Sequence, residues 1–292
     1  MGMALGALSR LEADHEHVRG CHDQVGVSNI ERATMGFDFN KMLAWKLRAG
    51  SHKFPGPHGG TCINEAAIVA AGLEYRPVSD ISDLPDCFSP VIAEFALRLN
   101  DTMPANLRQK YLMPFVLCLA SSADTRKIEH ERAVLIMTRV MREIISLAAP
   151  TPHLAAQFRK VDSLERAVDT LRVVIDDKNN PLITHYKFSA LLAALVSLCP
   201  ACKPTPREMA SAVGVFVSPI VATAVLLNRK TAVYAIAGRI LDSALAIGNQ
   251  GSGVVEIASE HMESARTQAA AKKSARVRQT APQKTGNQLV DA

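Results

Sequence analysis

The sequence lacks the patterns that identify secreted and β-sheet proteins. Its N-terminus, Met-Gly-Met-Ala-Leu-Gly, runs directly into charged residues and has no apolar signal core. No segment shows sustained period-two alternation, no strand–Gly–helix unit occurs, and no internal repeat of fixed period is present. These absences favour a helical protein of the cytoplasm.

Cysteine is also sparse, with six in 292 residues. That density does not suit a disulfide scaffold, so we expect free thiols in a reducing compartment. Only residues 210–227 approach the length of a membrane span. This stretch contains Ser211, Gly214 and Pro219, lies between charged residues and has no second span beside it. It is therefore interpreted as a buried core helix, and no membrane contact is expected.

The formal net charge of +5 is concentrated at the C-terminus. From Arg266 onward there are six basic residues and one acid, Asp291, so residues 1–265 are formally neutral. This tail has no aromatic residues and is expected to be a disordered, solvated extension. Weak nonspecific contact with nucleic-acid phosphates is the other interpretation left open for it.

Apolar residues recur at helical spacing through most of the chain, which predicts an all-α fold of stacked helical hairpins around one elongated core. The expected helices cover residues 39–47, 61–72 (capped by Thr61 and stopped by Gly72), 91–100, 106–119 (kinked at Pro114), 124–150, 151–175, 184–198, 207–227 (broken near Pro219) and 230–247.

Four regions are predicted along the chain. Residues 1–35 form a loosely ordered N-terminal segment, and residues 36–150 form a helical region that includes a glycine-rich turn. Residues 151–264 form a second helical region, continuous with the first. Residues 265–292 form the disordered basic tail.

The most distinctive motif is His58-Gly59-Gly60-Thr61-Cys62, which leads into a helix. A helix N-terminus attracts anions and favours a thiolate, so Cys62 is a candidate nucleophile with His58 or His52 as its base. The alternative is structural: the glycines make a tight turn and Cys62 is a small buried residue. The structural interpretation is preferred because no third orienting group is identifiable.

Cys199-Pro200-Ala201-Cys202 has the spacing of a redox pair or of half a zinc site. The βαβ context of a thioredoxin-like pair is absent, and a zinc site would need further ligands such as His185 or Cys118. A helix end terminated by proline is the preferred interpretation.

The densest group of metal-ligand residue types lies near the N-terminus and comprises His15, His17, Cys21 and His22. His17 and Cys21 would share one face of a helix, and zinc could bind them. Adventitious metal affinity is the preferred interpretation, because no closed four-ligand motif is present. No cofactor is expected.

Several segments between residues 40 and 125 resemble an uncharacterised group of bacterial proteins. The resemblance is carried by Lys-Phe-Pro-Gly-Pro-His-Gly-Gly-Thr-Cys-Ile-Asn-Glu-Ala-Ala-Ile-Val-Ala-Ala-Gly (residues 53–72), with Tyr75-Arg76-Pro77, residues 99–104 and residues 112–116. It implies a helical protein of the bacterial cytoplasm and transfers no catalytic role to any residue.

The sequence favours a non-enzymatic accessory or regulatory protein that acts through a protein partner. Continuous apolar helices without a complete catalytic set motivate this expectation. The alternative is an enzyme or small-anion binder centred on residues 58–62.

Overall fold

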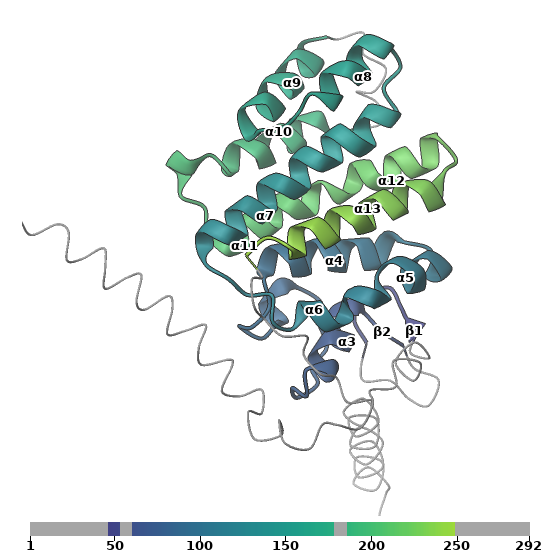
Figure 1. Cartoon of the computed structure of the whole chain (residues 1–292), viewed down its shortest axis with the longest axis vertical. Coiled ribbons are helices and arrows are strands. Elements are labelled where there is room, and N and C mark those ends of the chain that lie inside the picture. The colour runs from purple at the N-terminus through teal and green to yellow at the C-terminus, as the bar shows by residue number, and fades with distance from the viewer. Residues whose placement is uncertain (1–45, 53–59, 178–185, 249–292) are drawn as a thin grey trace, which may run out of the picture.

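The computed structural model describes residues 46–52, 60–177 and 186–248 (Figure 1). These residues form an all-α body of stacked helical hairpins, as predicted. The expected N-terminal segment over 1–35, the N-terminal metal-ligand group, His58 and the basic tail lie outside the described residues.

The chain enters the fold through a short parallel ribbon. Strand β1 (Lys46–Leu47) pairs with β2 (Gly60–Thr61), so that Leu47 lies opposite Thr61. A Cβ atom at Gly60 would lie 2.3 Å from Arg48 Cγ and 2.5 Å from the Lys46 carbonyl oxygen, so only glycine fits this register. The helix predicted over 39–47 is thus wrong at its last two residues, which pair as a strand.

Helix α3 (Ile63–Ala70) follows and is buried along its whole length. Gly72 ends it in a left-handed conformation with φ +72°, as predicted. A 3-10 turn, η2 (Ile81–Asp83), then leads to α4 (Pro90–Thr102), which Ser89 caps with a hydrogen bond from the Ile92 amide.

The next segment is broken around Pro114, as expected. It consists of α5 (Ala105–Tyr111), the 3-10 turn η3 (Met113–Phe115) and α6 (Val116–Leu119). The long helix after it begins as α7 (Arg126–Arg139), continues through a π-helical turn, η4 (Val140–Ile144), and closes in the 3-10 turn η5 (Ile145–Leu147).

The single helix predicted over 151–175 is two helices. Helix α8 (Pro152–Arg159) and helix α9 (Leu164–Asp176) are separated at Ser163, whose hydroxyl accepts a hydrogen bond from the Arg166 amide. The serine therefore starts a new helix although the apolar spacing continues past it.

The remaining helices are α10 (Phe188–Ser197), the 3-10 turn η7 (Pro200–Cys202), α11 (Pro206–Val215), α12 (Val217–Leu226) and α13 (Lys230–Leu245). The break predicted near Pro219 lies three residues earlier, at Phe216. Pro219 belongs to the first turn of α12, where a missing N–H costs no intrahelical hydrogen bond.

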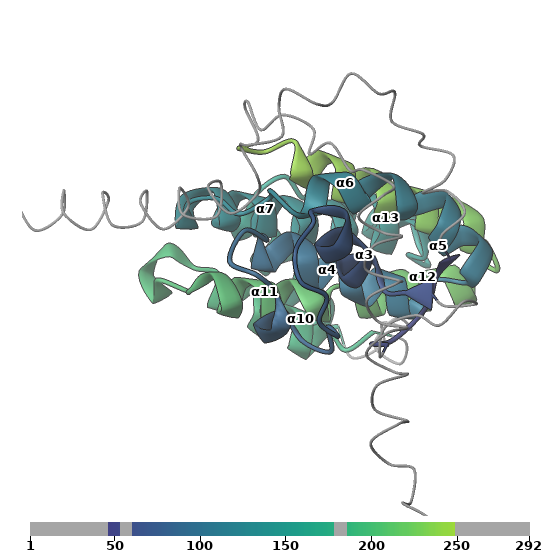
Figure 2. The same ribbon diagram turned by 90° about the horizontal axis from the view of Figure 1, so that it is seen from below.

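The helices form two layers. Helices α7 and α13 lie on one side, and α10, α11 and α12 lie on the other (Figures 1 and 2). Helix α4 packs closely on α11, where Gly214 leaves room for a carboxylate: a Cβ atom there would lie 2.6 Å from Glu94 Oε1. One cluster of buried apolar side chains runs through the body from Leu47 to Leu245.

Candidate functional site

Cys62, the candidate nucleophile, lies at the N-terminus of α3 and is fully buried. It is the N-cap residue, a role that the sequence assigned to Thr61. Its sulfur accepts a hydrogen bond from the Glu65 amide at 3.4 Å, and the Glu65 carboxylate accepts one from the Cys62 amide at 2.9 Å. The two residues form a reciprocal capping box with cysteine in the place of the usual serine or threonine.

The pKa of the Cys62 thiol is raised well above its ordinary value, chiefly by burial and then by the charge of Glu65. Hydrogen bonds from the Glu65 and Asn64 amides act in the opposite direction but are outweighed. The thiolate that a helix N-terminus was expected to favour is therefore disfavoured here. Because the thiolate is the reactive form of cysteine, this raised pKa disfavours a nucleophilic role for Cys62, whose contacts are those of a helix cap.

Glu65 connects three segments of the chain. Its Oε1 atom accepts hydrogen bonds from Ser51 Oγ at 3.1 Å, from the His52 amide at 2.9 Å and from the Val78 amide at 3.1 Å. His52 Nδ1 lies 3.5 Å from the other carboxylate oxygen, Glu65 Oε2. The same Oε2 atom accepts the hydrogen bond from the Cys62 amide. Glu65 thus holds His52, the proposed base, by its backbone. A carboxylate with this many donors acts as an anchor.

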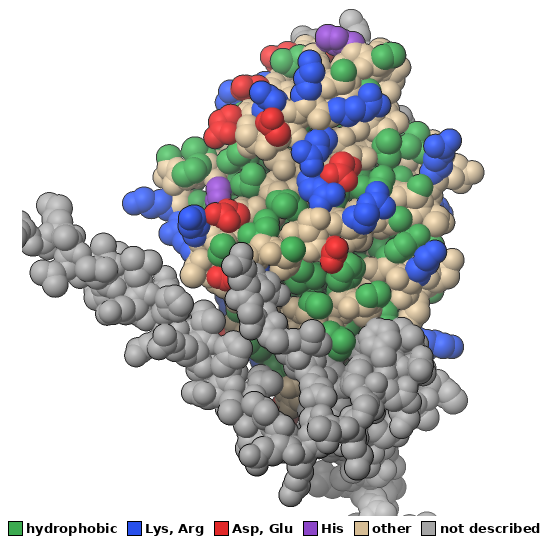
Figure 3. Space-filling view, in the orientation of Figure 1, with side chains coloured by type: hydrophobic (Ala, Val, Ile, Leu, Met, Phe, Trp, Pro, Cys, Tyr) green, Lys and Arg blue, Asp and Glu red, His purple; other side chains and the backbone are tan. Residues whose placement is uncertain are grey.

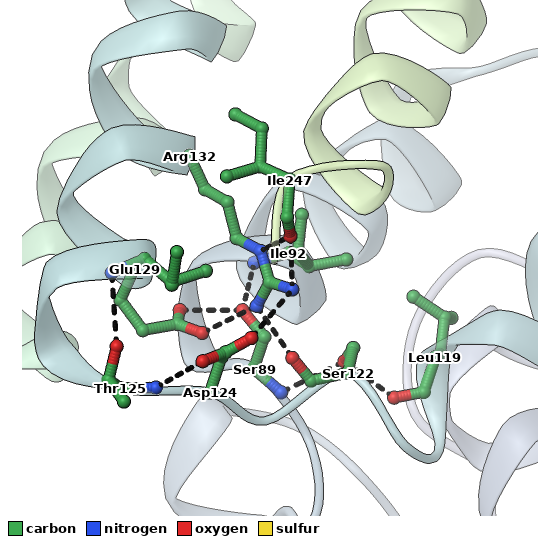
Figure 4. Close-up of polar contacts among 10 residues, drawn as sticks. Ser89, Ile92, Leu119, Ser122, Asp124, Thr125, Glu129, Arg132 and Ile247 are labelled. Carbon is green, nitrogen blue, oxygen red and sulfur yellow. Dashed lines mark hydrogen bonds and ion pairs between the residues drawn. The ribbon is translucent and has the colours of Figure 1, made fainter. Parts of the chain in front are cut away.

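A second buried polar network lies where α4, α7 and the end of α13 meet (Figure 4). The Arg132 guanidinium, which has no exposed surface, pairs with Glu129 Oε1 at 2.7 Å and donates to the Ser122 carbonyl at 2.6 Å. It also donates through Nε and Nη2 to the Ile247 carbonyl, at 3.2 and 2.9 Å. This arginine therefore caps the C-terminal end of α13 from within the core.

The partner carboxylate, Glu129, is bonded on both oxygens. Its Oε2 accepts from the hydroxyl of Ser89, at 2.6 Å, while the same hydroxyl caps α4. Burial raises the pKa of Glu129, against the opposing effects of Ser89 and Arg132. Removing one partner of such a buried pair typically costs about 3–5 kcal/mol. The network is a structural clamp that ties α4, α7 and the end of α13 together.

Sequence reasoning did not single out this clamp, although a signal for it was present. The apolar stripe of α7 includes Ala133 and Ile136 and continues into η4 at Val140. Glu129 precedes Ala133 by four residues and therefore extends the same buried face. A charged residue in register with a core stripe predicts a buried partner, and Arg132 lies one turn away.

The other sequence candidates are dispersed. Within the described ranges no three His, Cys, Asp or Glu side chains are placed to hold a metal ion. Cys118 is exposed on α6, Cys202 is exposed on η7, and Cys199 is partly exposed. His185, named as a possible zinc ligand, lies outside the described residues.

Helix α12 carries apolar side chains on its outer face. The exposed or partly buried positions of this face follow helical spacing. They are the polar Ser218 and the apolar Val221, Ala222, Val225 and Leu226. Val225 is 63% exposed and Leu226 is 41% exposed, and Leu147, on the neighbouring turn η5, is 44% exposed. On the face that Figure 3 shows, which includes α7 and α13, Lys and Arg are interspersed with Asp, Glu and hydrophobic side chains.

The same region contains the one apolar stretch of membrane length among the described helices. It runs over Pro206–Leu226, and 56% of its most apolar window is buried inside the fold. It is divided into α11 and α12 at Phe216. Burial of this kind is typical of core helices, and length and composition alone are weak evidence for a membrane span.

No family model, curated protein or solved structure matches this chain.

Proposed function

We propose that this chain is an accessory or regulatory protein of the bacterial cytoplasm that acts by binding a protein partner. The partner-binding surface is the outer face of α12 together with Leu147, called the α12 surface below. Its exposed side chains on α12 are Val225 and Leu226, and the half-buried Val221 and Ala222, which also pack against the core, lie beside them.

The observation that carries this proposal is the gathering of exposed aliphatic residues at one end of the helix. Val225 and Leu226 occupy the last turn of α12, and the exposed Arg229 and Lys230 follow directly. Contiguous apolar surface with a polar rim is typical of protein–protein interfaces. The chemistry fits a partner that presents aliphatic or aromatic side chains beside acidic residues.

The alternative function, an enzyme or anion binder at residues 58–62, has less support. The amides of Asn64 and Glu65, which would meet a bound anion, point to the Cys62 sulfur. The carboxylate of Glu65 accepts the Cys62 amide at the N-terminus of α3, so it lies where an anion would have to approach the helix end. Both features favour the accessory function.

A photo-crosslinking amino acid introduced at position 225 or at position 173 tests the proposal. Val173, on α9, is the matched control because it is an aliphatic residue with similar exposure, 57%. In the source cells, position 225 is expected to crosslink to a discrete protein that position 173 does not capture.

The captured protein is then purified and its affinity measured directly. Val225→Asp should weaken binding by about tenfold or more, the size of a modest interface hot spot, whereas Val173→Asp should not. Equal crosslinking at the two positions, or full affinity of the Val225→Asp variant, would refute the α12 surface. Binding of the wild-type protein to liposomes instead would assign the surface to lipid.

A further inference from the structure

The connection between α10 and α11 projects from one edge of the body, at the left of Figures 1 and 2. It contains Cys199 and Cys202, the pair whose spacing suggested a redox or zinc site. Cys202 is exposed and Cys199 is partly exposed, so small molecules in solvent can reach the pair. The proposed partner surface on α12 does not include these residues.

The backbone of this connection brings the two cysteines together. The Cys202 amide donates to the Cys199 carbonyl at 2.8 Å, and the Lys203 amide donates to the Pro200 carbonyl at 3.2 Å. A four-residue turn closed in this way holds its first and last Cα atoms within about 7 Å. Disulfides span Cα separations of about 4.4–6.8 Å, so the turn is compatible with a bond between the two sulfurs.

The sulfur of Cys202 is directed back toward the end of α10. It lies 3.8 Å from the Val196 carbonyl oxygen, which also accepts a hydrogen bond from the Cys199 amide at 3.0 Å. The shared acceptor places the Cys202 sulfur and the Cys199 amide at the same C-terminal end of α10. Because the turn already holds the two Cα atoms within the range of a disulfide, closing the bond requires rotation of side chains more than movement of the chain.

Two side chains of α7 fix the turn at both ends. A ring nitrogen of His130, Nε2, lies 2.7 Å from the Leu198 carbonyl oxygen, and Arg126 Nε donates to the Pro204 carbonyl at 2.9 Å. The cysteines lie between these two anchors. A preorganised pair of thiols loses little entropy when it closes to a small ring.

We propose that Cys199 and Cys202 are a redox-active dithiol that is oxidised to an internal disulfide by exchange with a small disulfide such as oxidised glutathione. The exposed Cys202 thiolate attacks one sulfur of the small disulfide, forms a mixed disulfide and releases one small thiol. The Cys199 thiolate then attacks the Cys202 sulfur and releases the second small thiol. Two electrons pass from the protein thiols to the small disulfide, and two protons accompany the two thiols released.

Zinc binding by the same pair is less well supported. A structural zinc site takes four ligands, and the pair supplies two. In the described part of the chain no third His, Cys, Asp or Glu completes a group with them.

The test uses the full-length protein in buffers with increasing ratios of oxidised to reduced glutathione. The reaction is quenched by acid, free thiols are alkylated, and the peptides are identified by mass spectrometry. The expected product links Cys199 to Cys202, with the loss of two hydrogen atoms and no retained glutathione.

Two serine variants, one of them a control, sharpen the result. Cys199→Ser is expected to accumulate the glutathione adduct at Cys202 at about ten times the wild-type level or more, because the resolving thiol is missing. Cys118→Ser, which removes another exposed thiol, should leave the internal disulfide unchanged. Two results with the wild-type protein alone would overturn the proposal. One is stable glutathione adducts on both cysteines, and the other is no peptide that links Cys199 to Cys202 at any ratio of oxidised to reduced glutathione.

Discussion

Two turns of this molecule share one local design and differ in their surroundings. The turn into α3 has Cys62 as N-cap and Glu65 as the reciprocal capping residue. The turn into α11, just after Cys202, has Thr205 as N-cap and Glu208 in the same reciprocal role. The first turn is buried and the second is exposed.

The difference shows that burial decides what such a motif does. At the α3 turn, Cys62 and Glu65 have no exposed surface, and the carboxylate of Glu65 also accepts hydrogen bonds from Ser51, His52 and Val78. At the α11 turn, the carboxylate of Glu208 serves only Thr205, through its amide and hydroxyl at 2.7 and 2.9 Å, among the hydrogen bonds seen in the described residues. The same residue type is an anchor for three segments in one place and a local cap in the other.

The largest expected effect comes from Glu65→Gln. The variant loses the charge and turns an NH₂ group toward backbone and hydroxyl donors, so buried donors are left unpaired. We expect a loss of about 3 kcal/mol in the free energy of unfolding, the upper range for hydrogen bonds to a charged group. Urea unfolding followed by circular dichroism measures it as a lower midpoint with an unchanged slope.

Glu208→Gln is the matched control for that substitution. It makes the same chemical change at the same position of a capping box, but in contact with water. If Glu208→Gln lowers the free energy of unfolding as much as Glu65→Gln does, burial does not distinguish the α3 turn from the α11 turn.

A smaller, pH-dependent effect is expected from Glu208 itself. Hydrogen bonds from the Thr205 amide and hydroxyl lower the pKa of Glu208 below its ordinary value of 4.5. A carboxyl group with a lowered pKa in the folded state stabilises the fold above its unfolded pKa and loses that contribution as pH falls through the folded pKa.

Thermal unfolding of the wild-type protein and of Glu208→Gln between pH 7 and about pH 3 tests this contribution. The wild-type protein should have the higher melting temperature above pH 4.5, and the difference should shrink toward the acid end of the range. A difference that is constant over this range would contradict the role of the ionised cap.

The fold was largely predictable because helical spacing and capping residues are local signals. The stop at Gly72, the proline break near residue 114 and the start at Pro152 follow from single residues. The split at Ser163 was missed because its apolar stripe continues across the break. The strand at Lys46–Leu47 depends on a partner that is distant in sequence, which a local pattern cannot supply.

The direction of the pKa shift of the Cys62 thiol was less predictable than the fold. Position at a helix N-terminus lowers a thiol pKa, whereas burial and a nearby carboxylate raise it. The sequence displays the first feature directly, through Gly59, Gly60 and the helix that follows. The effects that raise the thiol pKa depend on tertiary packing around Cys62 and on the position of the Glu65 carboxylate. Only the folded chain therefore shows that they outweigh the effect of the helix N-terminus.

The most direct test of this account compares the reactivity of Cys62 and Cys202 in the folded, reduced protein. Limited alkylation with iodoacetamide, followed by peptide mass spectrometry, gives the labelling rate of each cysteine, with exposed Cys118 as a reference. Cys202 is expected to react at least about tenfold faster than Cys62, which should label only when the protein is unfolded. Labelling of native Cys62 as fast as Cys202 would contradict its assignment as a buried cap and would restore the α3 turn as a reactive site.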